Sequence, residues 1–248
     1  DACTTASNHS LDQGSAGVDS TLRALDRNGI RHAGSARSAA EAARPVILTT
    51  RSGVKVALIA WTMVSNGQTA DHPWRVNATD SALPVLRAAR RARMAGAQVV
   101  IVNFHWGDEF HQTPNALQQR VARTLAISGL VTAVVGQHAH VVQPIRFAGG
   151  SLVLYGEGNL VSAQSEGPGM PAATQDGVIG LLRIRVPAEG EGQLERIDYM
   201  PTYVQHPGHT IIPVGVDRSR PEFVASLRRT LAVMGRGRHF GPWRSLTP

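Results

Sequence analysis

The sequence predicts an α/β protein built on two packed sheets. Two apolar runs, residues 99–102 and 131–135, have the length and composition of buried parallel strands, and a helical pattern separates them. After residue 140 the remaining strand-like segments are joined by Gly-rich turns instead of helices. Hydrophobic residues make up 42% of the 248-residue chain and charged residues 17%, which is an ordinary globular balance.

The N-terminal part is predicted to form a strand followed by a helix. Residues 2–6 are a run of small side chains, in which Cys3 fits a small buried hydrophobe. Because Cys3 is the single cysteine, an internal disulfide is excluded. Apolar side chains then recur at helical spacing and end at a stop signal, on Val18, Leu22, Leu25 and Asn28-Gly29.

A hairpin and a long loop are expected next. Residues 45–50 and 54–61 read as two strands around the turn Ser52-Gly53. Residues 62–78 are polar and contain Gly67 and Pro73, so they are predicted to form a loop. Loops of this length inside a domain are often functional.

Two helices are predicted on either side of the strand at 99–102. The first spans residues 80–95 and ends before Gly96. The second is expected to have Thr113 as its N-cap and Pro114 at its first helical position. Its buried stripe and its end are predicted at Leu117, Val121, Leu125 and Gly129.

The second sheet is predicted to be largely antiparallel and to pack on the first. Its strands are expected at residues 141–147, 151–154, 178–186 and 194–204, and residues 156–176 are expected to drape over a cleft. A capping-box pattern, Ser219 to Glu222, opens a last helix. We expect one domain over residues 1–248, with a core at 1–204 and a C-terminal extension with a helix at 205–248.

Polar clusters follow three predicted strands. They are Asn8-His9-Ser10-Leu11-Asp12, then Asn103 to Glu109 with His105 inside it, and Gly136-Gln137-His138-Ala139-His140. The carboxyl ends of neighbouring parallel strands meet at one crevice, where α/β sheets bind their ligands. Neutral imidazoles with nearby carboxylates suit a divalent transition metal. The alternative is that these residues are satisfied polar groups at strand ends.

The same residues resemble a known family. Asn8 to Gly14, His105-Trp106-Gly107-x-Glu109, Gly136-x-His138-x-His140 and Tyr155-x-x-Gly158-Asn159 occur in the order and spacing of the CapA family of poly-γ-glutamate capsule biosynthesis proteins. The resemblance runs from Asp1 to about Tyr203. It implies a metallophosphatase-like αββα sandwich of two mixed sheets flanked by helices, with a two-metal site.

The resemblance also implies roles for individual residues. Asn8, His105 and His138 would bind one metal, and His140 the other. His9 would act as the general acid, and Asp12 would orient it or close the loop. Glu109 and Asn159 would contact the substrate or support the ligands, and for both a turn-stabilising role is an equal alternative. The metals implied are divalent ions, two in the full-length protein, drawn from Zn, Mn, Fe and Mg.

Three positions depart from the family pattern, and the start of the chain is abrupt. Ser7 replaces a second Asn, Gln137 replaces a frequent His, and Ala139 replaces a common Pro. The chain begins with Asp1 and enters a strand almost at once. We therefore expect a fold lacking its N-terminal strands. The resemblance implies that the first metal-binding Asp residues and any signal or anchor lie upstream.

The charge favours anionic partners. The formal net charge is +7, and Lys55 is the only Lys among 25 basic residues. Excess Arg suits polyglutamate, phosphates or acidic lipids. The Arg residues are scattered and aromatics are few, so nucleic acid is not expected.

The leading hypothesis is a capsule-type protein whose metal-dependent, phosphoesterase-like site handles an acidic polymer such as poly-γ-glutamate at the cell envelope or the extracellular face of the membrane. One alternative is a non-catalytic polymer-binding component of a membrane synthase complex. Another is a general metallophosphoesterase unrelated to capsule. If the protein is an enzyme, it is expected to be a metal-dependent hydrolase.

Overall fold

The computed structural model describes residues 1–188 and 190–234, which form three sheets and five α-helices within those ranges. The strands are β1 (Ala2–Thr4), β2 (Arg31–Ala33), β3 (Val46–Thr49), β4 (Lys55–Thr62), β5 (Val99–Trp106), β6 (Ala133–His138), β7 (Val142–Ala148), β8 (Ser151–Glu157), β9 (Asp176–Arg185), β10 (Gln193–Gln205) and β11 (Thr210–Ile212). The helices are α1 (Gly14–Arg27), α2 (Ala39–Ala42), α3 (Ala82–Met94), α4 (Ala116–Ala126) and α5 (Pro221–Met234), with a short 3₁₀ turn at Ala172–Gln175. None of these helices combines the length and apolar character needed to cross a bilayer.

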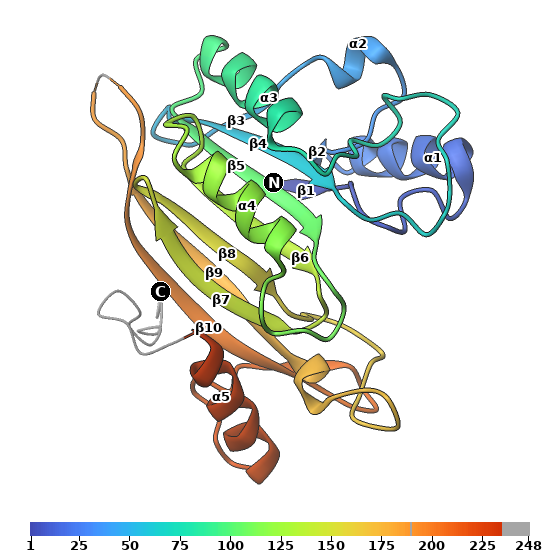
Figure 1. The fold of residues 1–248 in the computed structure, drawn as a ribbon, viewed down its shortest axis with the longest axis vertical. Coiled ribbons are helices and arrows are strands. Elements are labelled where there is room, and N and C mark those ends of the chain that lie inside the picture. The colour runs from blue at the N-terminus through green and yellow to red at the C-terminus, as the bar shows by residue number, and fades with distance from the viewer. Residues whose placement is uncertain (189, 235–248) are drawn as a thin grey trace.

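The largest sheet has six strands in the order β3-β4-β5-β6-β8-β7 (Figure 1). Its four central strands are parallel, and the edge strands β3 and β7 are antiparallel to their neighbours. The predicted α/β class and the predicted hairpin of β3 and β4 are confirmed. So is the parallel pairing of the two strands that precede His105 and His138.

The expected membership of the second sheet was wrong for two strands. Residues 141–147 and 151–154 were assigned to it, yet they form the β7–β8 hairpin, in which β8 pairs in parallel with β6 in the first sheet. A glycine turn at Gly149 and Gly150, both with positive φ, closes this hairpin. The sequence shows that two strands are connected by a tight turn, but not which free sheet edge they join.

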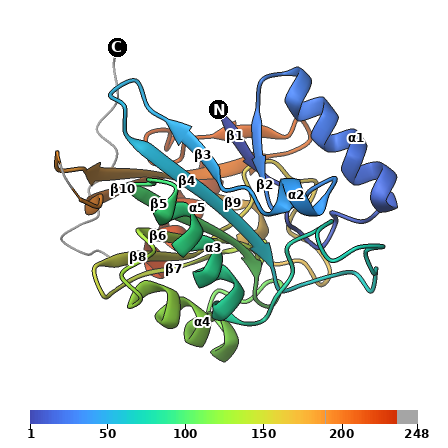
Figure 2. The ribbon, with the colours of Figure 1, turned by 90° about the horizontal axis from the view of Figure 1, so that it is seen from above.

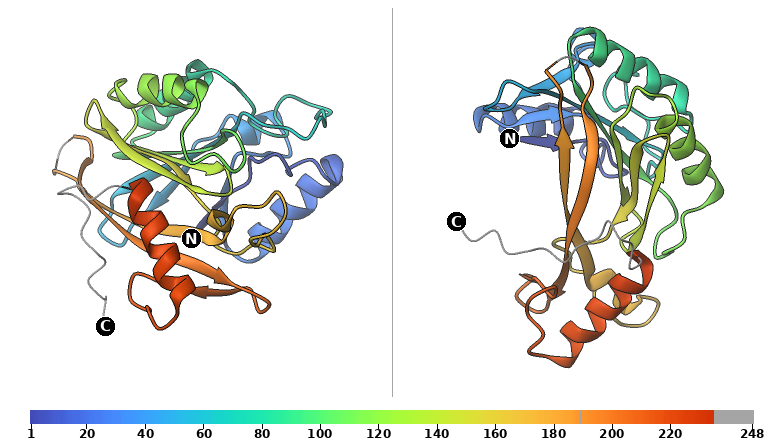
Figure 3. Two further views of the ribbon diagram at one scale, coloured as in Figure 1. Left: turned by 60° about the horizontal axis from the view of Figure 1, so that its bottom comes forward. Right: turned by 90° about the vertical axis from the view of Figure 1, so that its left-hand side faces the viewer.

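Three of the other strands form a second sheet. β9, β10 and β11 make a three-stranded antiparallel sheet that packs against one face of the large sheet, while α3 and α4 cover the other face (Figures 2 and 3). Alternating side chains of β5 explain both contacts. Val102, Phe104 and Trp106 belong to the core shared with the helices, whereas Ile101 packs toward β9 and β10.

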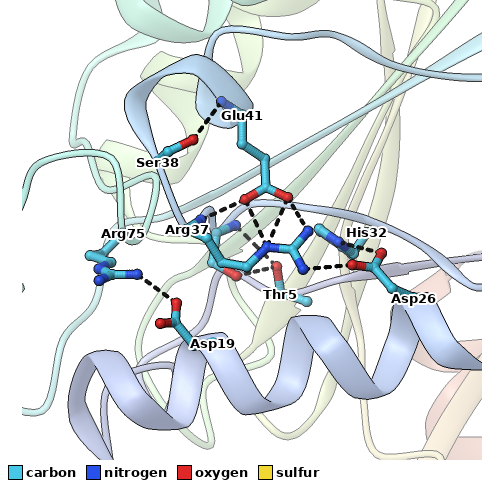
Figure 4. A network of polar contacts seen from close by, with 9 residues as sticks. Thr5, Asp19, Asp26, His32, Arg37, Ser38, Glu41 and Arg75 are labelled. Carbon is cyan, nitrogen blue, oxygen red and sulfur yellow. Dashed lines mark hydrogen bonds and ion pairs between the residues drawn. The ribbon is translucent and has the colours of Figure 1, made fainter.

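A separate two-stranded sheet, with its helix, carries the loop that contains Asn8. β1 pairs in parallel with β2, and α1 connects them. Arg37 forms ion pairs with Asp26 of α1 and with Glu41 of α2, and the backbone of Ser35 donates to Thr5 after β1 (Figure 4). Nearby, Arg75 of the 62–78 loop contacts Asp19 of α1 at 2.6 Å. These contacts hold α1 and the segment after β1 against α2 and the 62–78 loop.

Two local predictions need correction. The N-cap of α4 is Asn115 and not Thr113, and Pro114 precedes the helix instead of starting it. Asn115 forms a reciprocal capping box with Gln118, which satisfies two free backbone N–H groups at once. Cys3 is exposed and not buried as predicted, because its side chain points to the opposite face of β1 from those of Ala2 and Thr4, which are partly buried. The helix predicted from Val18, Leu22 and Leu25 is confirmed as α1, and the last helix, predicted after the pattern Ser219 to Glu222, is confirmed as α5.

Candidate metal centre

The ends of β5 and β6 place two histidines side by side. In the parallel register Trp106 lies opposite His138, and His105 lies opposite Gln137. The imidazole rings of His105 and His138 are 4.7 Å apart between centroids, and the ring of His140 lies 6.2 Å from that of His138. The strand-end histidines of the sequence therefore do converge at one edge of the sheet.

Asn8 reaches the same edge from the loop after β1. Its side chain is buried, and its Oδ1 lies 2.9 Å from Nε2 of His105. Its Nδ2 donates to Oδ1 of Asn66 in the 62–78 loop, at 3.1 Å. Because the amide nitrogen is engaged by Asn66, the carbonyl oxygen of Asn8 is directed toward His105.

Burial keeps the two central imidazoles neutral. Desolvation, helped by the neighbouring His138 and His140, lowers the pKa of His105 to about 3. Desolvation also lowers the pKa of His138, against a smaller opposite influence of Glu109. A neutral imidazole keeps the lone pair that a metal ion requires.

The backbone around these residues is strained and tightly packed. His138 and His140 have φ values of 95° and 57°, in a region that residues with side chains rarely adopt. At Gly136 an added Cβ would lie 1.9 Å from the backbone oxygen of Tyr155. Non-glycine residues at positive φ concentrate at functional sites, where the surrounding structure holds them in place.

Asn159 determines which nitrogen of His140 is free. Its Nδ2 donates to the backbone oxygen of Thr174 at 2.8 Å and to Oε1 of Gln164 at 2.9 Å, so its Oδ1 must be the atom that faces Nδ1 of His140 at 2.9 Å. Since Oδ1 only accepts, Nδ1 carries the proton and Nε2 is left with its lone pair. Oε1 of Glu109 lies 4.0 Å from that Nε2.

His9 and Asp12 form a pair at the exposed side of the cluster. Nδ1 of His9 lies 2.8 Å from Oδ2 of Asp12, and Nε2 of Gln68 donates to the other carboxylate oxygen at 3.3 Å. The hydrogen bonds from His9 and Gln68 lower the pKa of Asp12. Asp12 therefore orients the ring of His9 and leaves its Nε2 facing outward from the pair.

Two polar residues of this region, Asn66 and Gln68, were not predicted from the sequence. They lie in a loop whose path no local pattern gives, so nothing in the sequence connected them to Asn8 and Asp12. Asn103 belonged to the predicted polar cluster but was given no role, although it precedes His105 by two residues and so shares its face of β5. Its Oδ1 is buried and has no hydrogen-bond partner among the described residues.

The donors fit a divalent ion in chemical type. Asn8 offers an amide oxygen that touches His105, and Nδ1 of His138 is buried without a partner among the described residues. Orphaned buried donors and acceptors are costly unless something binds them. Within the described part of the chain, however, no three His, Cys, Asp or Glu side chains lie close enough together to form a complete metal site.

Comparison with known proteins identifies the family and two relatives of this chain. The family model described as "Bacterial capsule synthesis protein PGA_cap" matches residues 1–164. The "PGA biosynthesis protein CapA" of Bacillus subtilis is 29% identical over 163 residues, which cover 64% of this chain and 42% of that protein. The "Capsule biosynthesis protein CapA" of Bacillus anthracis is 26% identical over 163 residues, which cover 64% and 39%. The chain thus spans less than half the length of these relatives.

A solved structure supports the fold. The calcineurin-like phosphoesterase YfkN from Bacillus subtilis superposes with a TM-score of 0.52 and 16% identity, over 94% of this chain and 70% of that chain. The predicted metallophosphatase-like class of fold is confirmed by this match. The family resemblance carried by the four motifs is confirmed by the family model. The chain belongs to the bacterial capsule synthesis protein (PGA_cap) family.

Proposed function

We propose that the protein acts in capsule biosynthesis through a metal-dependent, phosphoesterase-like site that handles an acidic polymer. The observation that carries this proposal is the meeting of Asn8, His105 and His138 at the carboxyl ends of β5 and β6. Asn8, His105 and His138 would hold one divalent ion, and His140 would contribute to a second. Such an ion polarises a phosphoryl or carbonyl oxygen and lowers the pKa of a bound water.

The chain's own residues would position the substrate and move a proton. His9 is exposed and its Nδ1 is engaged by Asp12, so its Nε2 is the atom available to protonate a leaving group. Oε1 of the exposed Glu109 lies 4.0 Å from Nε2 of His140, so Glu109 would contact the substrate or support the ligands. Asn159 holds His140 in the tautomer that leaves Nε2 free.

Poly-γ-glutamate is the polymer that we propose. The Bacillus subtilis relative is named for PGA biosynthesis, and both relatives are named CapA. The net charge of +7, nearly all of it Arg, favours a polyanion. We therefore propose that the protein works at the cell envelope, in contact with a membrane synthase complex.

A non-catalytic role is the second candidate. It rests on the net charge of +7, since a basic protein can bind a polyanion without any reaction. In that role the histidine cluster would bind the polymer for the synthase, with no bond broken.

One experiment separates the two. The full-length protein would be loaded with zinc or manganese and assayed on a chromogenic phosphodiester and on purified poly-γ-glutamate, with His138→Ala as the comparison. Metal-dependent turnover that His138→Ala abolishes supports the enzyme. A protein that holds its metal and binds the polymer, yet turns over neither substrate, is the non-catalytic component. If the protein binds neither metal nor polymer, both candidates are wrong.

A further inference from the structure

We propose, building on the proposed function, that Arg229 and Asp176 are positioning residues for His140. Helix α5 would then be part of the structure that supports the candidate metal centre. The evidence is a chain of contacts that runs from α5 through Asp176 and Asn159 to the imidazole.

The first contact is an ion pair with a buried carboxylate. Asp176 opens β9, and its side chain is only 2% exposed. Arg229 of α5 donates from Nε to Oδ2 at 2.7 Å and from Nη2 to Oδ1 at 2.8 Å. A bidentate arginine fixes both the position and the plane of the carboxylate, and a buried carboxylate depends on such a partner.

The second contact joins Asp176 to the segment that carries Asn159. The backbone N–H of Asn159 donates to the backbone oxygen of Asp176 at 3.1 Å, beside an antiparallel bridge between Gly158 and Gly177. An added Cβ would lie 2.3 Å from the oxygen of Asp176 at Gly158, and 2.3 Å from the oxygen of Asn159 at Gly177. The two backbones are therefore in direct contact, and a shift of Asp176 is transmitted to Asn159.

The third contact is the side chain of Asn159. Its Nδ2 donates to the oxygen of Thr174, two residues before Asp176, and its Oδ1 accepts from Nδ1 of His140 at 2.9 Å. The segment from Thr174 to Asp176 thus holds Asn159 by both backbone and side chain. Asn159 in turn keeps the proton on Nδ1 of His140, which leaves Nε2 as the ligand atom.

This support lies outside the part of the chain that carries the family motifs. The match to the family model covers residues 1–164, whereas Asp176 and Arg229 come later. The sequence reasoning treated residues 205–248 as an extension of the core. The contacts instead assign α5 to the support of His140.

The test compares Arg229→Met with Arg228→Met in the full-length protein. Arg228 is the neighbouring, exposed arginine of the same helix, so its replacement changes the same charge without touching Asp176. The first readout is the tautomer of His140 in metal-free protein, measured by ¹⁵N NMR of the imidazole nitrogens and assigned with His140→Gln. The second is zinc affinity by competition with a chromophoric chelator.

We expect Arg229→Met to reduce the population of the Nδ1–H tautomer of His140. It should also weaken zinc binding roughly tenfold, which is the effect of losing a residue that orients a metal ligand. Arg228→Met should change neither. Arg229→Lys keeps the charge but loses the bidentate hydrogen bonding, so its tautomer population and zinc affinity should lie between those of the two Met variants. A purely structural role would lower the melting temperature of Arg229→Met while leaving the tautomer of the folded protein unchanged.

A second variant covers the case in which Arg229→Met does not fold because Asp176 is left as an unpaired charge. The double variant Asp176→Asn, Arg229→Met carries no buried charge and is expected to fold. If the folded variants keep the wild-type tautomer, the inference is overturned. If the wild type binds no zinc, the proposed metal site is wrong, and the tautomer measurement still decides whether α5 positions His140.

Discussion

The side-chain oxygen of Asn8 lies 2.9 Å from Nε2 of His105, although 97 positions separate the two residues in the sequence. Asn8 comes from the loop after β1, in the small parallel sheet, and His105 from the end of β5 in the large sheet. The contact therefore joins two separate sheets at the candidate metal centre. The oxygen only accepts, so Nε2 of His105 donates to it in this structure. Two atoms that bind one ion at about 2.1 Å each also lie about 3 Å apart, so the same pair could share an ion once Nε2 gives up its proton.

Removing a central imidazole is expected to remove the metal. We predict that His138→Ala lowers zinc affinity of the full-length protein by at least about tenfold, since a ligand contributes no less than its outer contacts do. His72→Ala is the control, because His72 is exposed and stacks on Trp74 instead. The measurement is metal content by elemental analysis after dialysis. Equal metal content in wild type and His138→Ala would exclude His138 as a ligand.

Replacing His9 is expected to separate chemistry from metal binding. We predict that His9→Ala keeps the metal content of the wild type and lowers turnover by about 10²- to 10⁴-fold, the usual contribution of a general acid. Asp12→Asn should have a smaller effect in the same direction, because it loosens the ring of His9 without removing it. Steady-state assays on the phosphodiester substrate measure both. Unchanged turnover in His9→Ala would show that the exposed imidazole does not take part in the reaction.

Glu157 is predicted to make the stability depend on pH. Burial raises the pKa of Glu157, and the hydrogen bond from Gln137 only partly opposes this. The folded state therefore retains a proton that the unfolded state has released, and stability is lost as the pH rises through the pKa of the folded state.

Glu157→Gln removes this pH dependence, because the new amide stays neutral while its oxygen can still accept from Gln137. Chemical denaturation should give similar stabilities for the two proteins near about pH 4 and a more stable variant near about pH 7. A variant that is less stable than the wild type at neutral pH would mean that the charged carboxylate is needed in the fold.

The capping residue of α4 provides a paired test of the corrected helix start. Asn115→Ala is expected to cost about 1 kcal/mol of unfolding free energy, because it leaves the N–H of Gln118 without its acceptor. Thr113→Ala should change stability by much less, since Thr113 is exposed and precedes the cap. Urea denaturation compares the two. A larger loss in Thr113→Ala would restore the start that the sequence predicted.

Gly136 is expected to tolerate no side chain. In Gly136→Ala the new Cβ would overlap the oxygen of Tyr155 at 1.9 Å and approach Nε1 of Trp106 to 2.4 Å. We predict a loss of roughly 3 kcal/mol, at the upper end of overpacking effects. Gly180→Ala is the control, since its Cβ would meet only Leu154, at 4.0 Å. A thermal melt in which both variants match the wild type would contradict the packing described around His138.

Local patterns in the sequence were sufficient to place His105 and His138. An apolar run that ends in a polar cluster identifies the end of a buried strand, and two consecutive parallel strands bring their ends to one edge. The helix between them followed from the spacing of Val121 and Leu125, although its first residue did not. Caps depend on which side chain reaches the first N–H groups, and Thr113 and Asn115 are both residues that can do so.

The contacts of Asn66, Asn159 and Glu157 could not be predicted in the same way. Each contact depends on which distant segment a loop or strand packs against in the folded protein, and loops carry no periodic pattern that would predict their path. The place of β7 and β8 was missed for a related reason. A hairpin pattern fixes the pairing of two strands with each other, while the sheet they join depends on which edge is left free by the rest of the fold.

The sequence by itself determined the class of the fold, the family and the residue types of the candidate centre. It could do so because apolar periodicity and ordered motifs are local properties of the chain. Only the tertiary structure decided that Asn8 contacts His105, that Asn159 sets the tautomer of His140, and that Arg229 of α5 forms an ion pair with Asp176. These contacts join segments that are distant in sequence. They form only when the packing of the layers brings the segments together and burial makes each unpaired polar group costly.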